Sequence, residues 1–170
     1  MIRLLSPFLL VLTAWNVSAF ADEKYSSASG MYVAVFPMKP TETSTPADPA
    51  KGTYAFFSTS LEINKDSSYM VMYHDYPTGV IKDKPEVVLE RVRDGTKGNS
   101  GRVIEDKEIA QGTDKIPGRA FLLNLGDYHY KAHIFLKGDR LYQVIITGKT
   151  KEEVTSAAAD KFINSFEIVK

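Results

Sequence analysis

The 170-residue sequence contains 21 basic and 21 acidic residues and no cysteine. This balance of charge gives no electrostatic reason to expect binding to nucleic acid or to an anionic membrane surface. The lack of cysteine excludes disulfides, thiolate metal sites and cysteine nucleophiles within this sequence.

The first 21 residues have the three parts of a secretory signal peptide. Arg3 supplies a positive charge, an apolar stretch runs from Leu4 to Trp15, and Ala19 and Ala21 are the small residues that signal peptidase requires. The apolar stretch is shorter than the roughly 20 residues of a membrane-spanning helix. We therefore expect cleavage after Ala21, export to the periplasm or the medium, and no stable membrane insertion of the mature chain.

The predicted elements begin after a polar, serine-rich stretch. Residues 22–30 are expected to form a flexible lead-in, and 31–37 (MYVAVFP) a strand that ends at a proline. Residues 38–52 hold three prolines and many hydroxyl side chains, which favours a loop or an irregular edge strand. Residues 53–63 and 68–76 are expected to pair as a hairpin, because the intervening NKDS favours a turn.

A helix is expected to begin near Pro85, since proline is favoured in the first turn of a helix. Val88, Leu89 and Val92 would then form one apolar stripe. Gly95 is placed to end this helix, because glycine commonly follows the last helical residue.

Four strands are expected to follow the helix. Residues 101–111 alternate like a strand whose charged side chains face outward. Residues 120–125, 129–136 and 141–148 indicate an antiparallel meander, because short turn-forming segments separate them. Two of these three strands are apolar at odd and even positions alike, so they require cover on both faces.

The last predicted helix supplies such cover. Thr150 and Glu153 form a capping box at its start. Apolar residues then repeat at helical spacing at Val154, Ala157, Ala158 and Phe162. After the helix, residues 166–169 are placed to return as a short strand. We therefore predict an α+β fold, a single domain over 31–170 in which helices cover one or both faces of an antiparallel β-sheet.

Five short segments in this order resemble the exported PsbP-like proteins of the PsbP/Mog superfamily, which have an α/β/α sandwich fold. They are FPMKP (36–40), YMVMYHDYP (69–77), IPGRA (116–120), DRLYQVIITG (139–148) and FINSF (162–166). The resemblance implies a non-enzymatic accessory or partner-binding module. The photosystem-II subunit and the Ran-binding protein of that superfamily bind protein partners, but no functional residue of theirs can be assigned to a position in this sequence.

Met70, Met72 and His74 alternate along a predicted strand and therefore share one face of it. Methionine sulfur and imidazole select Cu(I), so one hypothesis is a copper site. The alternative is ordinary packing, because methionines fill irregular gaps beneath covering helices. The opposite face of the same strand is also apolar, which favours the packing interpretation.

The other candidate sites have simpler explanations. The GNSG around Ser100 is similar to the G-D-S-G of serine proteases, but nothing supplies a base or an oxyanion hole. His129 and His133 would lie about 13 Å apart on a strand, too far to share one ion. Arg119 begins a core strand, where it would bind a carboxylate or phosphate ligand or, as we favour, pair with a neighbouring acidic residue.

Three hypotheses for function follow. The leading one is a non-catalytic, exported accessory or binding domain without a cofactor, which engages a protein partner or an envelope assembly. The second is a carrier that holds an apolar small ligand between sheet and helix. The third is a Cu(I)-binding protein that uses Met70, Met72 and His74. An enzyme is the least supported class, because paired carboxylates suited to acid–base chemistry are absent from the apolar strands.

Overall fold

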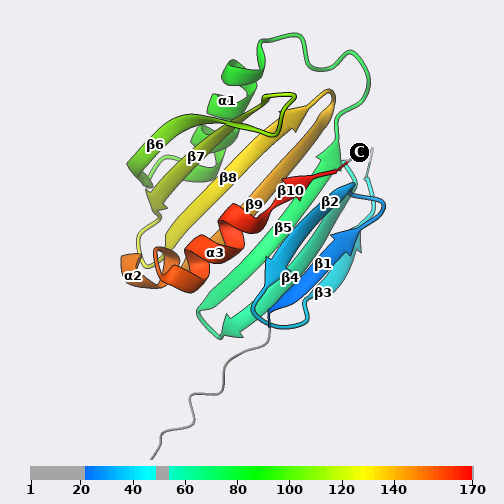
Figure 1. The fold of residues 1–170 in the computed structure, drawn as a ribbon. Helices are drawn as coiled ribbons and strands as arrows, with labels where there is room; N and C mark the ends of the chain where they lie inside the picture. The colour runs from blue at the N-terminus through cyan, green and yellow to red at the C-terminus, as the bar shows by residue number, and fades with distance from the viewer. Residues whose placement is uncertain (1–21, 49–53, 170) are drawn as a thin grey trace, which may run out of the picture.

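The computed structural model describes residues 22–48 and 54–169, which form two antiparallel sheets and three helices. The predicted signal peptide, residues 1–21, lies outside the described residues, so cleavage and export stay predictions. Within the described ranges, no helix is both long enough and apolar enough to cross a membrane. The predicted α+β class, an antiparallel sheet covered by helices, is confirmed (Figure 1).

The larger sheet has seven strands in the spatial order β3-β4-β5-β9-β8-β7-β6. Their bounds are β3 (Thr41–Thr45), β4 (Phe56–Asn64), β5 (Ser67–Asp75), β6 (Arg102–Gln111), β7 (Ile116–Asn124), β8 (His129–Lys137) and β9 (Arg140–Gly148). The smaller sheet places β2 (Tyr32–Phe36) between β1 (Glu23–Ser27) and β10 (Glu167–Ile168). The helices are α1 (Pro85–Lys97), α2 (Lys151–Val154) and α3 (Ala157–Ser165).

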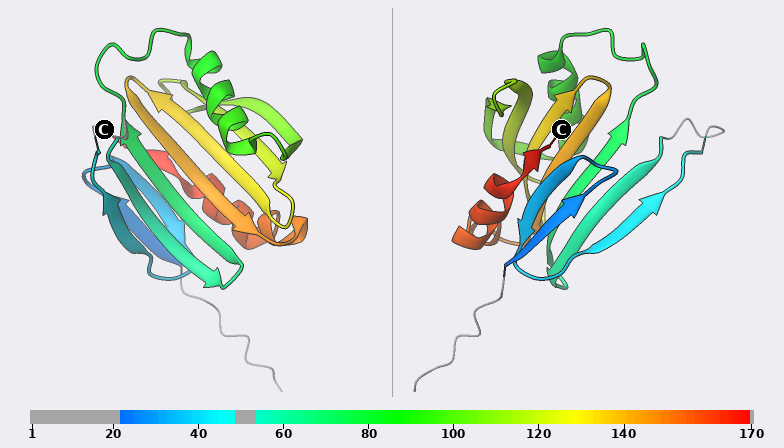
Figure 2. Two further views of the ribbon diagram at one scale, coloured as in Figure 1. Left: turned by 180° about the vertical axis from the view of Figure 1, so that it is seen from behind. Right: turned by 45° about the vertical axis from the view of Figure 1, so that its right-hand side comes forward.

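Both faces of the larger sheet are apolar, and each is covered by different elements. Leu89 of α1 packs on one face, against Phe121, Leu123, Ala132, Ile134, Leu136, Leu141 and Ile145. On the other face α3 and the smaller sheet enclose a second core, which includes Tyr32, Phe36, Tyr69, Val71, Tyr142, Val144, Ile146, Phe162 and Phe166. Figure 2 shows the two covers on opposite sides of the sheet. The expected two-sided burial of the central strands is therefore present.

The prediction of a flexible lead-in at residues 22–30 is wrong, because Glu23–Ser27 form strand β1 and pair with β2. The apolar pattern was too weak to reveal this strand. Tyr25 is its only large apolar residue, and the tyrosine ring packs edge-on against Phe36, with the ring centroids 6.2 Å apart. Strand β1 needs little more, since the smaller sheet is an outer layer and only one face of the strand meets the core.

Helix α1 begins at Pro85 as predicted but continues past Gly95 to Lys97. The C-terminal cap is Gly98, at a φ of 60°. Glycine adopts this left-handed conformation without the steric cost that a Cβ atom would add. The expected stop was therefore placed one helical turn too early.

The last helix is divided into two. The predicted capping box at its start forms, but α2 ends at Val154, and the side chain of Ser156 caps a new helix, α3. Because the helix restarts, the apolar stripe falls on different residues. Ala159 is fully buried, whereas Ala157 and Ala158 are exposed, so the predicted alanine contacts are wrong in register.

Gly118 of β7 offers a test of the packing between neighbouring strands. A Cβ atom at this position would lie 2.5 Å from Cδ1 of Phe135 and 2.7 Å from the carbonyl oxygen of Ile134. We expect Gly118→Ala to lower the free energy of unfolding by about 1–3 kcal/mol, because the overpacked strands must shift. Urea denaturation of the purified protein measures this change.

Gly95→Ala is the matched control for the Gly118 substitution. No atom lies within 4 Å of a Cβ built at Gly95, in the last turns of α1. Alanine is the better helix former, so the control should stabilise the protein by up to about 1 kcal/mol. Wild-type stability in Gly118→Ala would contradict the close strand packing.

Candidate functional site

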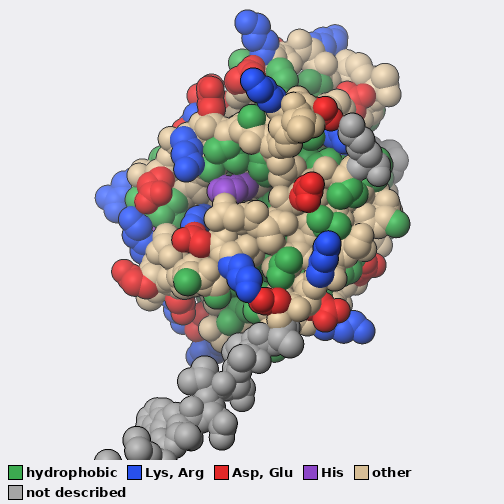
Figure 3. Space-filling model, viewed as in Figure 1, with side chains coloured by type: hydrophobic (Ala, Val, Ile, Leu, Met, Phe, Trp, Pro, Cys, Tyr) green, Lys and Arg blue, Asp and Glu red, His purple; other side chains and the backbone are tan. Residues whose placement is uncertain are grey.

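A cavity of about 570 Å³ opens between α3 and the strands β6, β7 and β8. Ala120 and Leu122 form its floor, and Ile104 and Ile163 contribute apolar walls on opposite sides. Its polar side chains include Lys107, Lys131, His133, Asp160 and Asn164. We call this cavity the sheet–α3 groove. On this face of the molecule, histidine atoms are visible at the surface among basic and acidic side chains (Figure 3).

The floor of the groove follows from strand register. Lys107 on β6 pairs with Ala120 on β7, which pairs with His133 on β8. Residues directly opposite one another on adjacent strands point to the same face. Lys107 and His133 therefore flank a methyl group, and the small side chain of Ala120 leaves open space between them.

A second cavity, of about 630 Å³, adjoins the groove at Asn164, which lines both. Its walls come from the β6–β7 turn and from the segment around β10. The side-chain amide of Gln111 fixes that segment, because it donates to the carbonyl oxygen of Phe166 at 2.8 Å and accepts from the amide of Ile168 at 3.0 Å. The two cavities therefore adjoin at Asn164, on the α3 side of the sheet.

His133 is neutral at physiological pH. Burial lowers the pKa of this imidazole to about 4, with help from the charges of Lys131 and Lys107 and against the opposing effect of Asp160. Within the described residues, neither ring nitrogen has a hydrogen-bond partner. A neutral imidazole offers one donor and one acceptor, so His133 can bind a polar group in the groove.

The two lysines of the groove differ in their pairing. Lys131 forms an ion pair with Asp160 at 2.5 Å, which ties β8 to α3. Lys107 has no ion-pair partner among the residues that the structure describes, and it is exposed. The groove therefore contains one compensated cation and one uncompensated cation.

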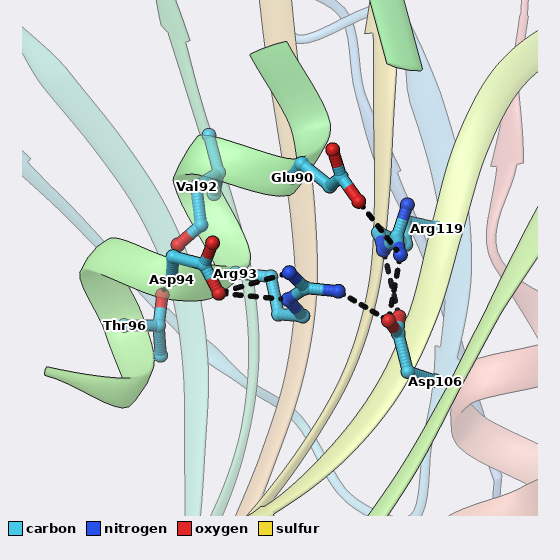
Figure 4. Close-up of polar contacts among 7 residues, drawn as sticks. All are labelled: Glu90, Val92, Arg93, Asp94, Thr96, Asp106 and Arg119. Atoms are coloured by element: carbon cyan, nitrogen blue, oxygen red, sulfur yellow. Dashed lines mark hydrogen bonds and ion pairs between the residues drawn. The ribbon is translucent and has the colours of Figure 1, made fainter. Parts of the chain in front are cut away.

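Arg119 lies on the opposite face of the sheet, toward α1, and forms the ion pair that the sequence favoured. Its Nε and Nη2 atoms donate to the two carboxylate oxygens of Asp106 at 2.7 and 2.6 Å, and Nη2 lies 3.5 Å from Glu90 (Figure 4). Arg93 of α1 also binds Asp106. Burial opposes ionisation of Asp106, but hydrogen bonds from the two arginines outweigh it and hold the pKa of the carboxyl below its ordinary value.

Met70, Met72 and His74 share one face of β5, as predicted. The methionines are half-buried and pack against the core beneath α1. His74 is 5% exposed, and burial lowers its pKa despite the nearby charge of Asp75. Its Nδ1 atom has no hydrogen-bond partner among the described residues. Three aromatic rings surround the imidazole, with centroids 4.7–5.9 Å away: Tyr54, Phe56 and Tyr76.

The remaining sequence candidates are not brought together. Ser100 is exposed in the turn after α1, and no hydrogen bond joins it to a histidine in the described part of the chain. His129 lies near the carbonyl oxygen of Lys149 at 3.2 Å and Asn124 at 3.5 Å, whereas His133 faces the groove. The two histidines therefore have separate surroundings.

The sequence did not identify the pairing of Lys107 with His133 across the groove. Each residue lies in a segment predicted as a strand, but their alignment depends on the register of three strands. The one usable signal was Ala120, a small residue directly before the bulky apolar run Phe121–Leu123. A small residue in such a position often marks open space above the sheet.

The fold is that of a solved structure, the solution structure of cyanobacterial PsbP (CyanoP) from Synechocystis sp. PCC 6803. The two superpose with a TM-score of 0.58 over 93% of this chain and 98% of that one, at 13% sequence identity. The PsbP-like fold expected from the sequence is thereby confirmed, and at this identity the likeness establishes the fold alone. No family model and no curated protein matches the chain.

The Asp106 cluster predicts how stability responds to acid. The lowered pKa of Asp106 means that its ion pairs contribute above the ordinary value of 3.8 and are lost as the pH falls below it. We expect Asp106→Asn to lower the free energy of unfolding by about 1–2 kcal/mol at pH 7, because hydrogen bonds to charged groups are lost. The difference from wild type should shrink at pH 3. Urea denaturation at both pH values measures it.

Asp83→Asn is the control for this substitution. Asp83 pairs with Arg91 at 2.5 Å, but both side chains are well exposed, at 47% and 66%. Exposed pairs contribute less than about 1 kcal/mol. An equal effect of the two substitutions would contradict a structural role specific to Asp106.

Proposed function

We propose that the protein is a non-catalytic, exported binding module and that the sheet–α3 groove holds an extended segment of a protein partner. The observation that carries this proposal is the pair of adjoining cavities, of about 570 and 630 Å³, which meet at Asn164. An apolar floor with a polar rim is typical of a recognition site. Export is supported by the signal-like residues 1–21.

The succession of two adjoining cavities favours an extended chain over a compact ligand. The two cavities continue one another along β6 and α3, and the bound segment would lie beside the outer edge of the sheet. Recognition of extended peptides beside sheet edges is a recurring arrangement in proteins. The second hypothesis, a carrier of an apolar ligand, receives less support, because charged residues stand at the rim of the cavity between sheet and helix.

The polar groups of the groove support binding more than chemistry. Its carboxylates at Asp160 and Glu105 are paired with Lys131 and Lys151, and Asp106 is engaged by arginines on the α1 side. None of these carboxylates is arranged with a nucleophile or a second acid, as general acid–base catalysis requires. The PsbP-like fold is consistent with an accessory role, although a fold by itself does not specify a partner.

Site-specific photo-crosslinking in the producing cells tests the proposed binding face. We expect a photoreactive amino acid at Asn164, which lines both cavities, to give a crosslinked adduct of one defined mass. The same amino acid at Glu42 is the control, because Glu42 is exposed on β3 at the opposite edge of the sheet. If the probe at Asn164 gives no adduct, or if Asn164 and Glu42 give identical adducts, a partner in the groove is refuted.

A second candidate function, Cu(I) binding by Met70, Met72 and His74, is favoured by one observation. The buried Nδ1 atom of His74 has no hydrogen-bond partner in the described part of the chain, and it lies on the same face of β5 as the methionines. Imidazole and thioether ligands together select Cu(I). The aromatic rings around His74 do not compete for its lone pair.

Competition with a chromogenic Cu(I) chelator tests the copper proposal. The double substitution Met70→Leu and Met72→Leu should weaken Cu(I) binding by more than about tenfold, which is typical for loss of even an outer-shell partner. Met31→Leu is the control, since Met31 is 41% exposed and directly precedes β2, which packs on the other face of β5. Unchanged Cu(I) affinity in the double variant would eliminate this site.

A further inference from the structure

We propose that the sheet–α3 groove recognises an acidic side chain of the partner segment, which Lys107 and His133 bind together, and that His133 takes up a proton in the complex. This inference rests on the proposed function and adds the chemistry of the bound group. It is carried by the placement of an uncompensated ammonium group and an unpartnered imidazole on either side of an open floor.

The spacing of Lys107 and His133 across Ala120 suits a carboxylate. Lys107 and His133 lie two strands apart, about 10 Å at the backbone, and their side chains point to the same side. The methyl group of Ala120 between them leaves room for the two oxygens of a carboxylate. One oxygen would accept from the ammonium group and the other from the imidazole, while the amide of Asn164 lies at the same cavity.

The apolar lining suits the residues that flank such a side chain. Ile104 is half-buried at the wall and offers most of the open apolar surface, and Leu122 and Ile163, although almost fully buried, border the same space. An acidic residue between apolar neighbours would place its carboxylate at Lys107 and its neighbours against these side chains. Burial of apolar surface contributes about 25 cal/mol per Å², so the flanking residues add affinity.

The charges that face His133 explain why binding would be coupled to a proton. Lys107 and Glu105 face it from β6, Lys131 from β8, and Asp160 from α3. The residues that β7 and β9 place opposite it, Ala120 and Val144, are uncharged. In the free protein burial and the two lysines hold the pKa of His133 at about 4. A carboxylate beside the ring favours the charged imidazole and raises that pKa.

Proton uptake by His133 determines how the affinity for the bound segment changes with pH. Because the complex binds one more proton than the free protein, affinity rises as the pH falls from the pKa of bound His133 toward about 4. The increase is at most about tenfold for each pH unit, the limit for uptake of one proton. A glutamate side chain ionises with a pKa of about 4.3, so it stays charged from pH 5.5 to 7.5.

The test uses two blocked peptides, acetyl-Leu-Glu-Leu-amide and its glutamine counterpart, with binding followed by NMR of the full mature chain. We expect the glutamate peptide to bind severalfold more tightly at pH 5.5 than at 7.5 and to raise the titration midpoint of the His133 imidazole. The glutamine peptide should bind more weakly and without dependence on pH. His133→Gln should abolish the pH dependence, and Lys107→Gln should weaken binding of the glutamate peptide alone.

Lys24→Gln, on the exposed edge strand β1, is the matched control and should change neither affinity. Equal binding of the two peptides, or binding of the glutamate peptide that is independent of pH, would overturn the inference. Tighter binding of hexanoate than of the glutamate peptide would also overturn it, since a free fatty acid would then be the ligand. If Asn164 gives the crosslinked adduct but the two peptides bind equally, the proposed function stands and only the recognition of a carboxylate is refuted.

Discussion

The apolar character of both faces of the seven-stranded sheet is the constraint on which the rest of the structure depends. Each face must be removed from water, so the chain needs two separate covers. One face has α1, and the other has α3 together with the smaller sheet. Seven strands span about 29 Å, whereas the three strands of the smaller sheet span about 10 Å and the single helix beside them is about 10 Å wide. The second cover therefore cannot reach β6, β7 and β8 completely, and the sheet–α3 groove is the part that it leaves open.

Strand β6 serves both sides of the sheet because successive side chains alternate between its faces. Asp106 points toward α1 and is bound by Arg119 and Arg93, which fixes the strand to the helix and to β7. The next residue, Lys107, pairs with Ala120 and points into the groove. The ion-pair cluster thus holds the groove wall in place from behind. A wall that is fixed before binding loses less conformational entropy when a partner is bound.

The sequence was most informative where hydrophobic pattern and turn residues agreed. The hairpin of β4 and β5, the meander of β7, β8 and β9, and the capping box before α2 all follow from such local signals. Strand β1 lacked them, since one tyrosine is enough to anchor an edge strand to a core that other segments build. The restart at Ser156 and the row of Lys107, Ala120 and His133 were also beyond sequence patterns. The first depends on local geometry, and the second on the register of three strands.

The position of β2 has a consequence for when the chain can finish folding. Its neighbour β10 joins it from far along the sequence, and the backbone amide of Val35 binds the hydroxyl of Ser165, 130 residues away. Contacts of such separation form late during synthesis and close slowly, because a long loop must be ordered first. Until then β2 lacks one of its partner strands, and the core between the larger sheet, α3 and the smaller sheet stays open. The predicted export through a narrow translocation channel requires an unfolded chain, and this delay would keep the chain unfolded for longer.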